Sequence, residues 1–190
     1  MNVATAPATA IPRPAAPKIA RSNLNGVWKL DKTKGQWHMR GYLQTLQVNE
    51  LAIQAHEKGE SDQETYHSIS LEDTTLKIIK RSRVNNDLVV ELNLGEEKVE
   101  YLQPGERPKK SLATTENPAT HLRIDSSLLT MNGMAHVTDI KRLVEDGTML
   151  FQELTILNEQ TGARNITTRY FVPEETIVLG RSNLADQMED

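Results

Sequence analysis

The eight residues Asn25-Gly26-Val27-Trp28-Lys29-Leu30-Asp31-Lys32 are the stretch from which the fold can be worked out. We predict a first β-strand over residues 27–33. The glycine two residues before Trp28 would let a neighbouring backbone approach closely, and a tryptophan is large enough to close one end of a β-barrel. Because a Gly-x-Trp triplet is frequent by chance, this role for Trp28 depends on what the rest of the chain forms.

From Tyr66 onward the chain shows the two-residue alternation of β-strands. Residues 88–94 illustrate it, since leucine and valine alternate there with Val89, Glu91 and Asn93, as in a half-buried strand. Turn residues separate the successive runs, and Asn132-Gly133 and Asp146-Gly147 are strong hairpin signals. The predicted strands are 66–71, 74–82, 87–94, 98–103, 109–115, 120–131, 135–145, 148–157 and 163–172.

These nine runs and the first strand make ten strands joined by short loops. A meander of this length usually avoids exposed edges by closing on itself. The sequence therefore predicts an all-β fold, a ten-stranded up-and-down antiparallel β-barrel.

Residues 37–58 form the one convincing helical stretch, because their apolar residues recur at close to helical spacing. The phase breaks at 46–49, where Asn49 is an acceptable N-cap for a second helix. Gly59 is a natural helix end. We expect two short helices that form a lid between the first and second strands.

The domain organisation follows from composition. Residues 1–22 are rich in alanine and proline and indicate a flexible arm, residues 23–173 the barrel, and residues 174–190 an acidic C-terminal tail. The arm lacks the continuous apolar core of a secretory signal. Its basic residues, with no acidic residue before Asp31, leave an organelle transit peptide as an alternative to a disordered arm.

Composition excludes several classes of function. The net charge of -4 and an aromatic content of 4% argue against nucleic-acid binding. The chain has no cysteine, which excludes disulfides, thiolate metal sites and cysteine nucleophiles and favours a reducing, cytoplasmic location. The five histidines lack the spacing of metal ligands, so we predict no metal and no cofactor. No stretch approaches the roughly 18 apolar residues of a membrane span.

Several segments resemble the intracellular lipid-binding proteins, the fatty-acid-binding branch of the lipocalin-like calycin superfamily. Residues 24–30 resemble the opening Phe-x-Gly-x-Trp-Lys-Leu of that family, with Leu24 in place of the phenylalanine. Residues 142–147 resemble its Arg-Glu-Leu-x-Asp-Gly, and residues 168–171 fall at its closing Thr-Arg-x-Tyr. The likeness extends from Leu24 to Val172.

The resemblance implies non-covalent binding and transport of a hydrophobic small molecule by a monomer. In the family, an arginine of the last strand, a tyrosine two residues later and an arginine two strands earlier bind a ligand carboxylate. The matching arginines are Arg169 and Arg142; Phe171 holds the tyrosine position, and Tyr170 lies one residue early, on the opposite face of a regular strand. The expected cavity-lining side chains are Leu88, Val90, Leu92, Ile140 and Phe151.

Other interpretations stay open at this point. Both arginines could face outward or pair with acids such as Asp139. Calycin barrels also include enzymes, so a cyclase or isomerase in which His136 and Arg142 act on a hydrophobic substrate is the alternative function. A barrel with a filled interior that binds a protein partner is a third.

Two surface features complete the expectations. The basic run Lys77, Lys80, Arg81 and Arg83 is interpreted as a solvated hairpin face. The lid, with Arg40 and Lys58 among acidic neighbours, offers a transient membrane contact.

Overall fold

The computed structural model describes residues 19–82 and 87–175. The predicted C-terminal tail beyond residue 175, most of the predicted arm, and Arg83 lie outside the described residues. The elements are β1 (Gly26–Gly35), α1 (Arg40–Thr45), α2 (Glu50–Asp62), β2 (Thr65–Glu72), β3 (Thr75–Ser82), β4 (Leu88–Asn93), β5 (Glu97–Leu102), β6 (Arg107–Thr114), β7 (His121–Thr130), β8 (Gly133–Val144), the 3₁₀ turn η1 (Glu145–Gly147), β9 (Met149–Asn158) and β10 (Arg164–Glu174).

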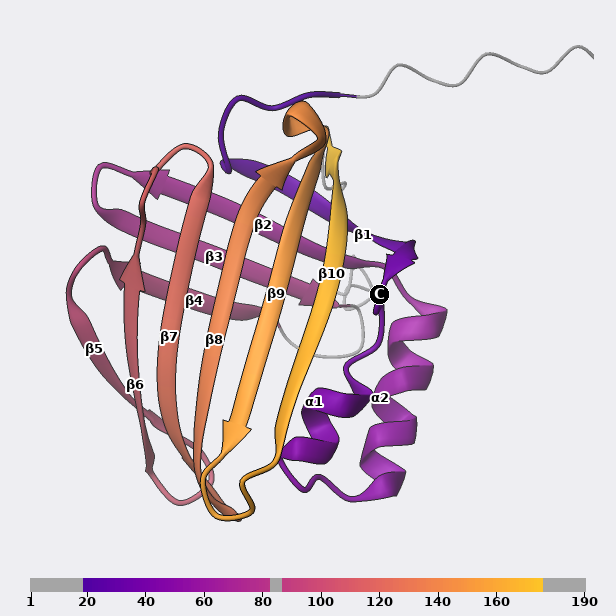
Figure 1. Cartoon of the computed structure of the whole chain (residues 1–190), viewed down its shortest axis with the longest axis vertical. Helices are drawn as coiled ribbons and strands as arrows, with labels where there is room; N and C mark the ends of the chain where they lie inside the picture. The colour runs from indigo at the N-terminus through magenta and orange to yellow at the C-terminus, as the bar shows by residue number, and fades with distance from the viewer. Residues whose placement is uncertain (1–18, 83–86, 176–190) are drawn as a thin grey trace, which may run out of the picture.

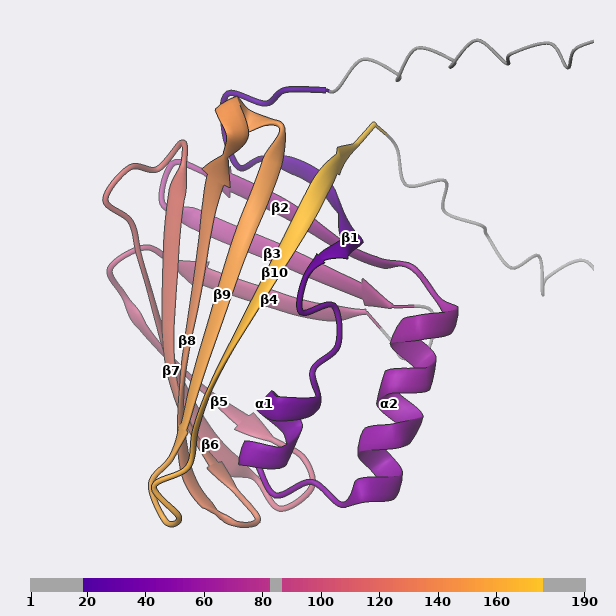
Figure 2. The same ribbon diagram turned by 45° about the vertical axis from the view of Figure 1, so that its right-hand side comes forward.

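The ten strands form one antiparallel sheet in the order β4-β3-β2-β1-β10-β9-β8-β7-β6-β5. The sheet curves so that its two halves face each other, as Figures 1 and 2 show. Pairing of β1 with β10, for example Leu30 with Phe171, joins the first strand to the last. β4 and β5 are the edges, and near them a single bridge links Leu94 to Ala113. The predicted ten-stranded barrel is confirmed, nearly closed rather than fully closed.

Both helices lie between β1 and β2 in the chain and beside one end of the barrel (Figure 2). The side chain of Asn49 accepts a hydrogen bond from the Ala52 N–H at 2.9 Å, so the predicted N-cap is present. The predicted end at Gly59 is wrong, because α2 continues to Asp62. Lys32 of β1 donates to the carbonyls of Ser61 and Gln63 at 2.9 and 2.6 Å, which satisfies backbone groups of this additional turn.

Trp28 closes the opposite end of the barrel. Its side chain is fully buried, and the indole N–H donates to the Leu24 carbonyl at 2.8 Å. The Arg21 guanidinium lies 5.6 Å from the centre of the Trp28 ring, and the Arg21 N–H donates to the Gly147 carbonyl at 2.9 Å. A Cβ on Gly147, whose φ is +80°, would lie 2.0 Å from the Arg21 carbonyl oxygen. Glycine is therefore required at position 147, where the Arg21 backbone comes close.

The interior changes from apolar to polar within one pleat. Near the end of the barrel that Trp28 closes, here called the floor, Leu143, Leu150 and Phe171 are paired neighbours on β8, β9 and β10. Two residues along each strand, the same face carries Lys141, Gln152 and Arg169. The apolar cluster around Trp28 also contains Leu24, Leu30, Ile69, Leu76, Ile78, Leu92, Ala113, Leu122 and Ile124.

Within residues 19–82 and 87–175, no helix is both long and apolar enough to cross a membrane.

Because Trp28 closes the floor of the barrel, we expect its substitution to have a large effect on stability. The Trp28→Ala change should lower the free energy of unfolding by about 3–5 kcal/mol, because it leaves a cavity and removes the indole hydrogen bond. Trp28→Phe, which keeps an aromatic ring at this position, should lower the free energy of unfolding by less.

Tyr101→Ala serves as the control, since Tyr101 is 66% exposed and its loss should change stability by about 0.5 kcal/mol or less. Equal effects at Trp28 and Tyr101 in urea unfolding would contradict the role of Trp28.

Candidate functional site

A cluster of charged side chains occupies the inner face of the barrel. Lys141 of β8, Gln152 of β9 and Arg169 of β10 are neighbours on one rung, and Asp139 lies two residues before Lys141 on the same face. Taken as whole residues, these four are between 0 and 5% exposed. Buried groups of this kind require partners, because leaving them unpaired in an apolar interior is costly.

Asp139 is the centre of the hydrogen bonding. The Lys141 Nζ donates to both of its carboxylate oxygens at 2.5 Å, and the Gln152 Nε2 donates to Oδ1 at 2.9 Å. The Lys80 Nζ, from β3 in the opposite half of the sheet, lies 3.3 Å from Oδ2. The carboxylate therefore joins the two halves across the interior.

The pKa values of the cluster reflect burial and the neighbouring charges. Burial acts to raise the pKa of Asp139, but the charges of Lys141 and Lys80, with the hydrogen bonds from Lys141 and Gln152, lower it well below its usual range. Burial lowers the pKa of Lys141 to about 8, and Lys80 and Arg169 act in the same direction against the opposing effect of Asp139. Burial, followed by the three neighbouring cations, lowers the pKa of His67 and keeps it neutral.

Arg169 has a different partner. Its Nη2 donates to Glu60 Oε1 of α2 at 2.9 Å and to the Trp37 carbonyl at 3.0 Å. The other Glu60 oxygen accepts from the Met39 N–H at 3.1 Å. Burial lowers the pKa of Arg169, and Glu60 partly offsets this effect. The Phe171 ring stacks with the His67 ring at 4.5 Å between centroids, and the Arg169 guanidinium carbon lies 5.7 Å from the centre of the Phe171 ring.

This cluster contains more positive than negative charge. Its cations are Lys80, Lys141 and Arg169, and its carboxylates are Asp139 and Glu60. Three buried polar atoms, Arg169 Nε, Gln152 Oε1 and His67 Nδ1, have no hydrogen-bond partner within the described part of the chain. The group can therefore accept one further negative charge and additional hydrogen bonds.

Several side chains on the inner face stay partly accessible to solvent. Lys80 keeps 29% of its side chain accessible, and Val90, Leu128 and Val137 on inner-face positions of β4, β7 and β8 are only half-buried. Val90 and an accessible ammonium group thus lie on the same face of two neighbouring strands.

Some of the residues predicted from the sequence lie on this face. Arg169 is 5% exposed, Phe171 is fully buried and Leu92 is 3% exposed. Val90 and Leu88 share the face of Leu92 on β4, where Leu88 is 58% exposed.

The predicted inward orientation of Arg142, Ile140 and Phe151 is wrong. Arg142 is exposed, and its guanidinium lies over the Phe151 ring at 4.6 Å on the outer face. Tyr170 packs against the same ring at 5.2 Å between centroids, on the outer face as strand alternation predicts. Because side chains alternate along a strand, Lys141 and not Arg142 supplies the inward cation of β8.

His136 also faces outward, and its Nε2 lies 2.5 Å from Glu159. The two residues named for the alternative enzyme, His136 and Arg142, are therefore both outside the barrel. The sequence does not reveal Lys80 for a similar reason, because a basic run such as that of β3 usually indicates a solvated face. Register in fact turns Lys80 inward and Lys77 outward, where Lys77 pairs with Glu91 at 2.6 Å.

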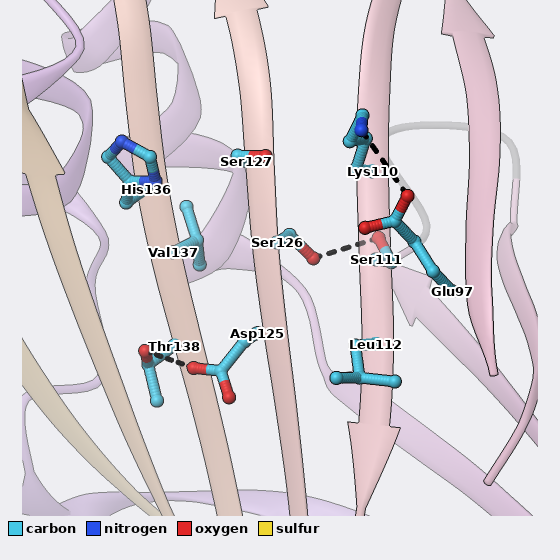
Figure 3. A pocket seen from close by; sticks show the side chains of 10 residues that line it. All are labelled: Glu97, Lys110, Ser111, Leu112, Asp125, Ser126, Ser127, His136, Val137 and Thr138. Atoms are coloured by element: carbon cyan, nitrogen blue, oxygen red, sulfur yellow. Dashed lines mark hydrogen bonds and ion pairs between the residues drawn. The ribbon is translucent and has the colours of Figure 1, made fainter. Parts of the chain in front are cut away.

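The pocket in Figure 3, of about 250 Å³, is lined mainly by outward-facing residues of β5 to β8. Its charged groups already have partners: Lys110 pairs with Glu97 at 3.3 Å, and Asp125 accepts a hydrogen bond from Thr138 at 2.7 Å. In the described ranges, no group of three or more histidine or acidic side chains could hold a metal ion. The inner cluster is therefore the stronger candidate site.

The comparisons with known proteins agree with this architecture. No protein-family model and no curated protein matches the sequence. Among solved structures 158 chains match. One is Caenorhabditis elegans lipid-binding protein 8 without ligand, with 22% identity, a TM-score of 0.58 and coverage of 79% of this chain and 94% of that one. The chain has the fold of the intracellular lipid-binding proteins.

Two further structures with this fold show how far the sequences have diverged. Human cRBP IV is 18% identical, with a TM-score of 0.57 over 80% of this chain and 98% of that one. The Schistosoma mansoni fatty acid binding protein in complex with arachidonic acid is 13% identical, with a TM-score of 0.55 over 82% and 98% of the two chains.

Loss of the buried carboxylate of Asp139 should destabilise the fold. Asp139→Asn should lower the free energy of unfolding by about 3–5 kcal/mol, because it leaves Lys141 and Lys80 together without a carboxylate. Adding Lys141→Met to that variant should restore part of the loss, since the uncompensated buried charge is then gone.

The matched control for this prediction is Asp125→Asn. Asp125 pairs with Arg123 on the outer face of β7, and a surface pair of this kind contributes at most about 1 kcal/mol. A double variant no more stable than Asp139→Asn alone, measured by urea unfolding, would contradict the assigned role of Lys141.

Proposed function

We propose that the protein binds and carries a hydrophobic small molecule with an anionic head group, such as a fatty acid, inside the barrel. The observation that carries the proposal is the inner cluster in which Lys80, Lys141 and Arg169 face only two carboxylates, Asp139 and Glu60. In a poorly solvated interior, such an excess of positive charge favours an anion.

Lys80 is the cation best placed to meet a ligand first. Its side chain is 29% accessible, whereas Lys141 is completely buried and paired with Asp139. A carboxylate beside Lys80 would share it with Asp139 and lie close to the lowered-pKa ammonium group of Lys141. The half-buried side chains of Val90 and Val137 would contact the hydrocarbon part.

The solved structures with this fold support the same class of ligand. They include a lipid-binding protein and a fatty acid binding protein in complex with arachidonic acid. The alternative of a cyclase or isomerase loses its basis, because His136 and Arg142 lie on the outer face.

The direct experiment is native mass spectrometry of the purified protein, followed by displacement of a fluorescent fatty acid. We expect a one-to-one adduct with a lipid or with added fatty acid, and displacement of the probe by unlabelled fatty acid. A protein that shows neither adduct nor probe binding would contradict the proposal.

The head-group position predicts a difference between two lysines of β3. Lys80→Met should weaken binding of a fatty acid by roughly 1–2 kcal/mol and leave the fatty alcohol of equal length unaffected, because only the acid uses the ammonium charge. Titration calorimetry with both ligands measures the difference.

Lys77→Met is the matched control, because Lys77 lies on the same strand but faces outward. Arg142→Gln is a second control on the outer face. Both variants should bind acid and alcohol as the unmodified protein does. A loss at Lys77 or Arg142 equal to that at Lys80 would place the head group elsewhere.

The lowered pKa of Lys141 predicts a pH dependence. Lys141 carries its charge below pH about 8 and loses it above, so affinity for an anion should fall as pH rises through this value. An alkyl sulfonate keeps its own charge throughout. Its affinity relative to the alcohol of equal length should fall by up to about tenfold between pH values of about 7 and 9. If the ratio of sulfonate affinity to alcohol affinity stays constant between these pH values, the charge of Lys141 does not contribute to binding of the ligand.

A further inference from the structure

The attachment of α2 to the barrel depends on very few buried groups. Ile53 and Glu60 are the buried residues of this helix. The remaining side chains of its polar surface are accessible, and Glu57 pairs with Arg40 of α1 rather than with the barrel. Apart from the hydrogen bonds that Lys32 of β1 donates to the carbonyls of Ser61 and Gln63, the position of α2 therefore depends on what Glu60 contacts.

Glu60 joins three parts of the chain. One carboxylate oxygen accepts from Arg169 of β10 at 2.9 Å, and the other accepts from the Met39 N–H, at the start of α1, at 3.1 Å. The Arg169 Nη2 also donates to the Trp37 carbonyl in the segment that leads to α1. Arg169 and Glu60 are 6 and 8% exposed, so this contact is shielded from solvent.

The location of Glu60 on its helix is otherwise unfavourable. It lies two residues before the end of α2 at Asp62, where the partial negative charge of the helix dipole repels a carboxylate. Burial adds a further desolvation cost. The charge-assisted hydrogen bond from Arg169 is the largest contribution that offsets both, beside the Met39 N–H on the other oxygen, which also has the His56 Nδ1 at 3.4 Å.

We propose that Glu60 is a specificity-determining residue that holds Arg169 as an internal carboxylate and is displaced when an anionic ligand takes its place. This inference rests on the proposed function. Arg169 carries one positive charge, which Glu60 already neutralises, so an acid that passes Lys80 and reaches Arg169 is repelled by Glu60, competes with it for the guanidinium and weakens the hold on α2. A neutral ligand leaves the Glu60–Arg169 pair intact.

The proposal has two consequences for ligand choice. Glu60 reduces the preference of the protein for acids over neutral lipids, because Arg169 is already neutralised. It also makes the ordering of α2 depend on the charge of the head group, so that acids loosen the lid and alcohols do not.

The first test changes only the charge of Glu60. Glu60→Gln keeps the size of the side chain and an oxygen that accepts from Arg169. It should raise the affinity for a fatty acid about tenfold or more relative to the fatty alcohol of equal length. Glu60→Gln/Arg169→Gln should lose this gain. Glu57→Gln removes the same charge from the same helix without touching Arg169 and should leave the ratio unchanged.

The second test uses the unmodified protein, so it does not depend on how well a variant folds. Hydrogen–deuterium exchange of the α2 amides should become faster on saturation with fatty acid and should not become faster with fatty alcohol. Acid that slows this exchange or leaves it unchanged would overturn the proposal.

The outcomes separate the two levels of inference. If neither acid nor alcohol binds any of these proteins, the proposed function itself fails. If both ligands bind and Glu60→Gln does not change the ratio of their affinities relative to Glu57→Gln, the proposed function stands and the role of Glu60 is overturned.

Discussion

The polar interior depends on the buried carboxylate of Asp139. Two ammonium groups, one from each half of the sheet, and the Gln152 amide converge on it. Without this carboxylate the low-dielectric interior would hold Lys141 and Lys80 as unpaired like charges, which is the costly arrangement. With it, both lysines are held inside the barrel but share one negative charge. The structural role of Asp139 and the proposed binding of an anion thus have the same origin.

The two ends of the barrel are held by different kinds of interaction. Trp28 closes the floor through apolar packing, an indole hydrogen bond and the close approach of Arg21 to Gly147. These contacts do not depend on whether a ligand is charged. At the helical end, α2 is held by hydrogen bonds from Lys32 and by the Glu60–Arg169 pair, a contact between full charges that we propose an anionic ligand exchanges. A response to ligand charge is therefore expected at the lid and not at the floor.

The fold could be predicted in detail because its signals are local: two-residue alternation, hairpin turns such as Asn132-Gly133, and a helix start at Asn49. The site could not. A single-residue change of phase reverses every side chain of a strand, and this is why Arg142 was expected where Lys141 lies. Tyr170 and Phe171 were oriented correctly because β10 is regular. The Glu60–Arg169 pair joins residues 109 positions apart, and no spacing within α2 indicates it. Asp139 and Lys141, opposite charges two residues apart on one strand face, are the one local signal that could have revealed the cluster.

The titration of Lys141 tests the central claim most directly. NMR of the lysine side chains, labelled with ¹³C at Cε, can follow this group in the free protein and in the presence of saturating fatty acid. We predict a pKa of about 8 in the free protein and a clear increase when the acid binds, because the ligand supplies the negative charge that the cluster lacks. An ordinary lysine pKa in the free protein, or a value that the fatty acid leaves unchanged, would contradict this account.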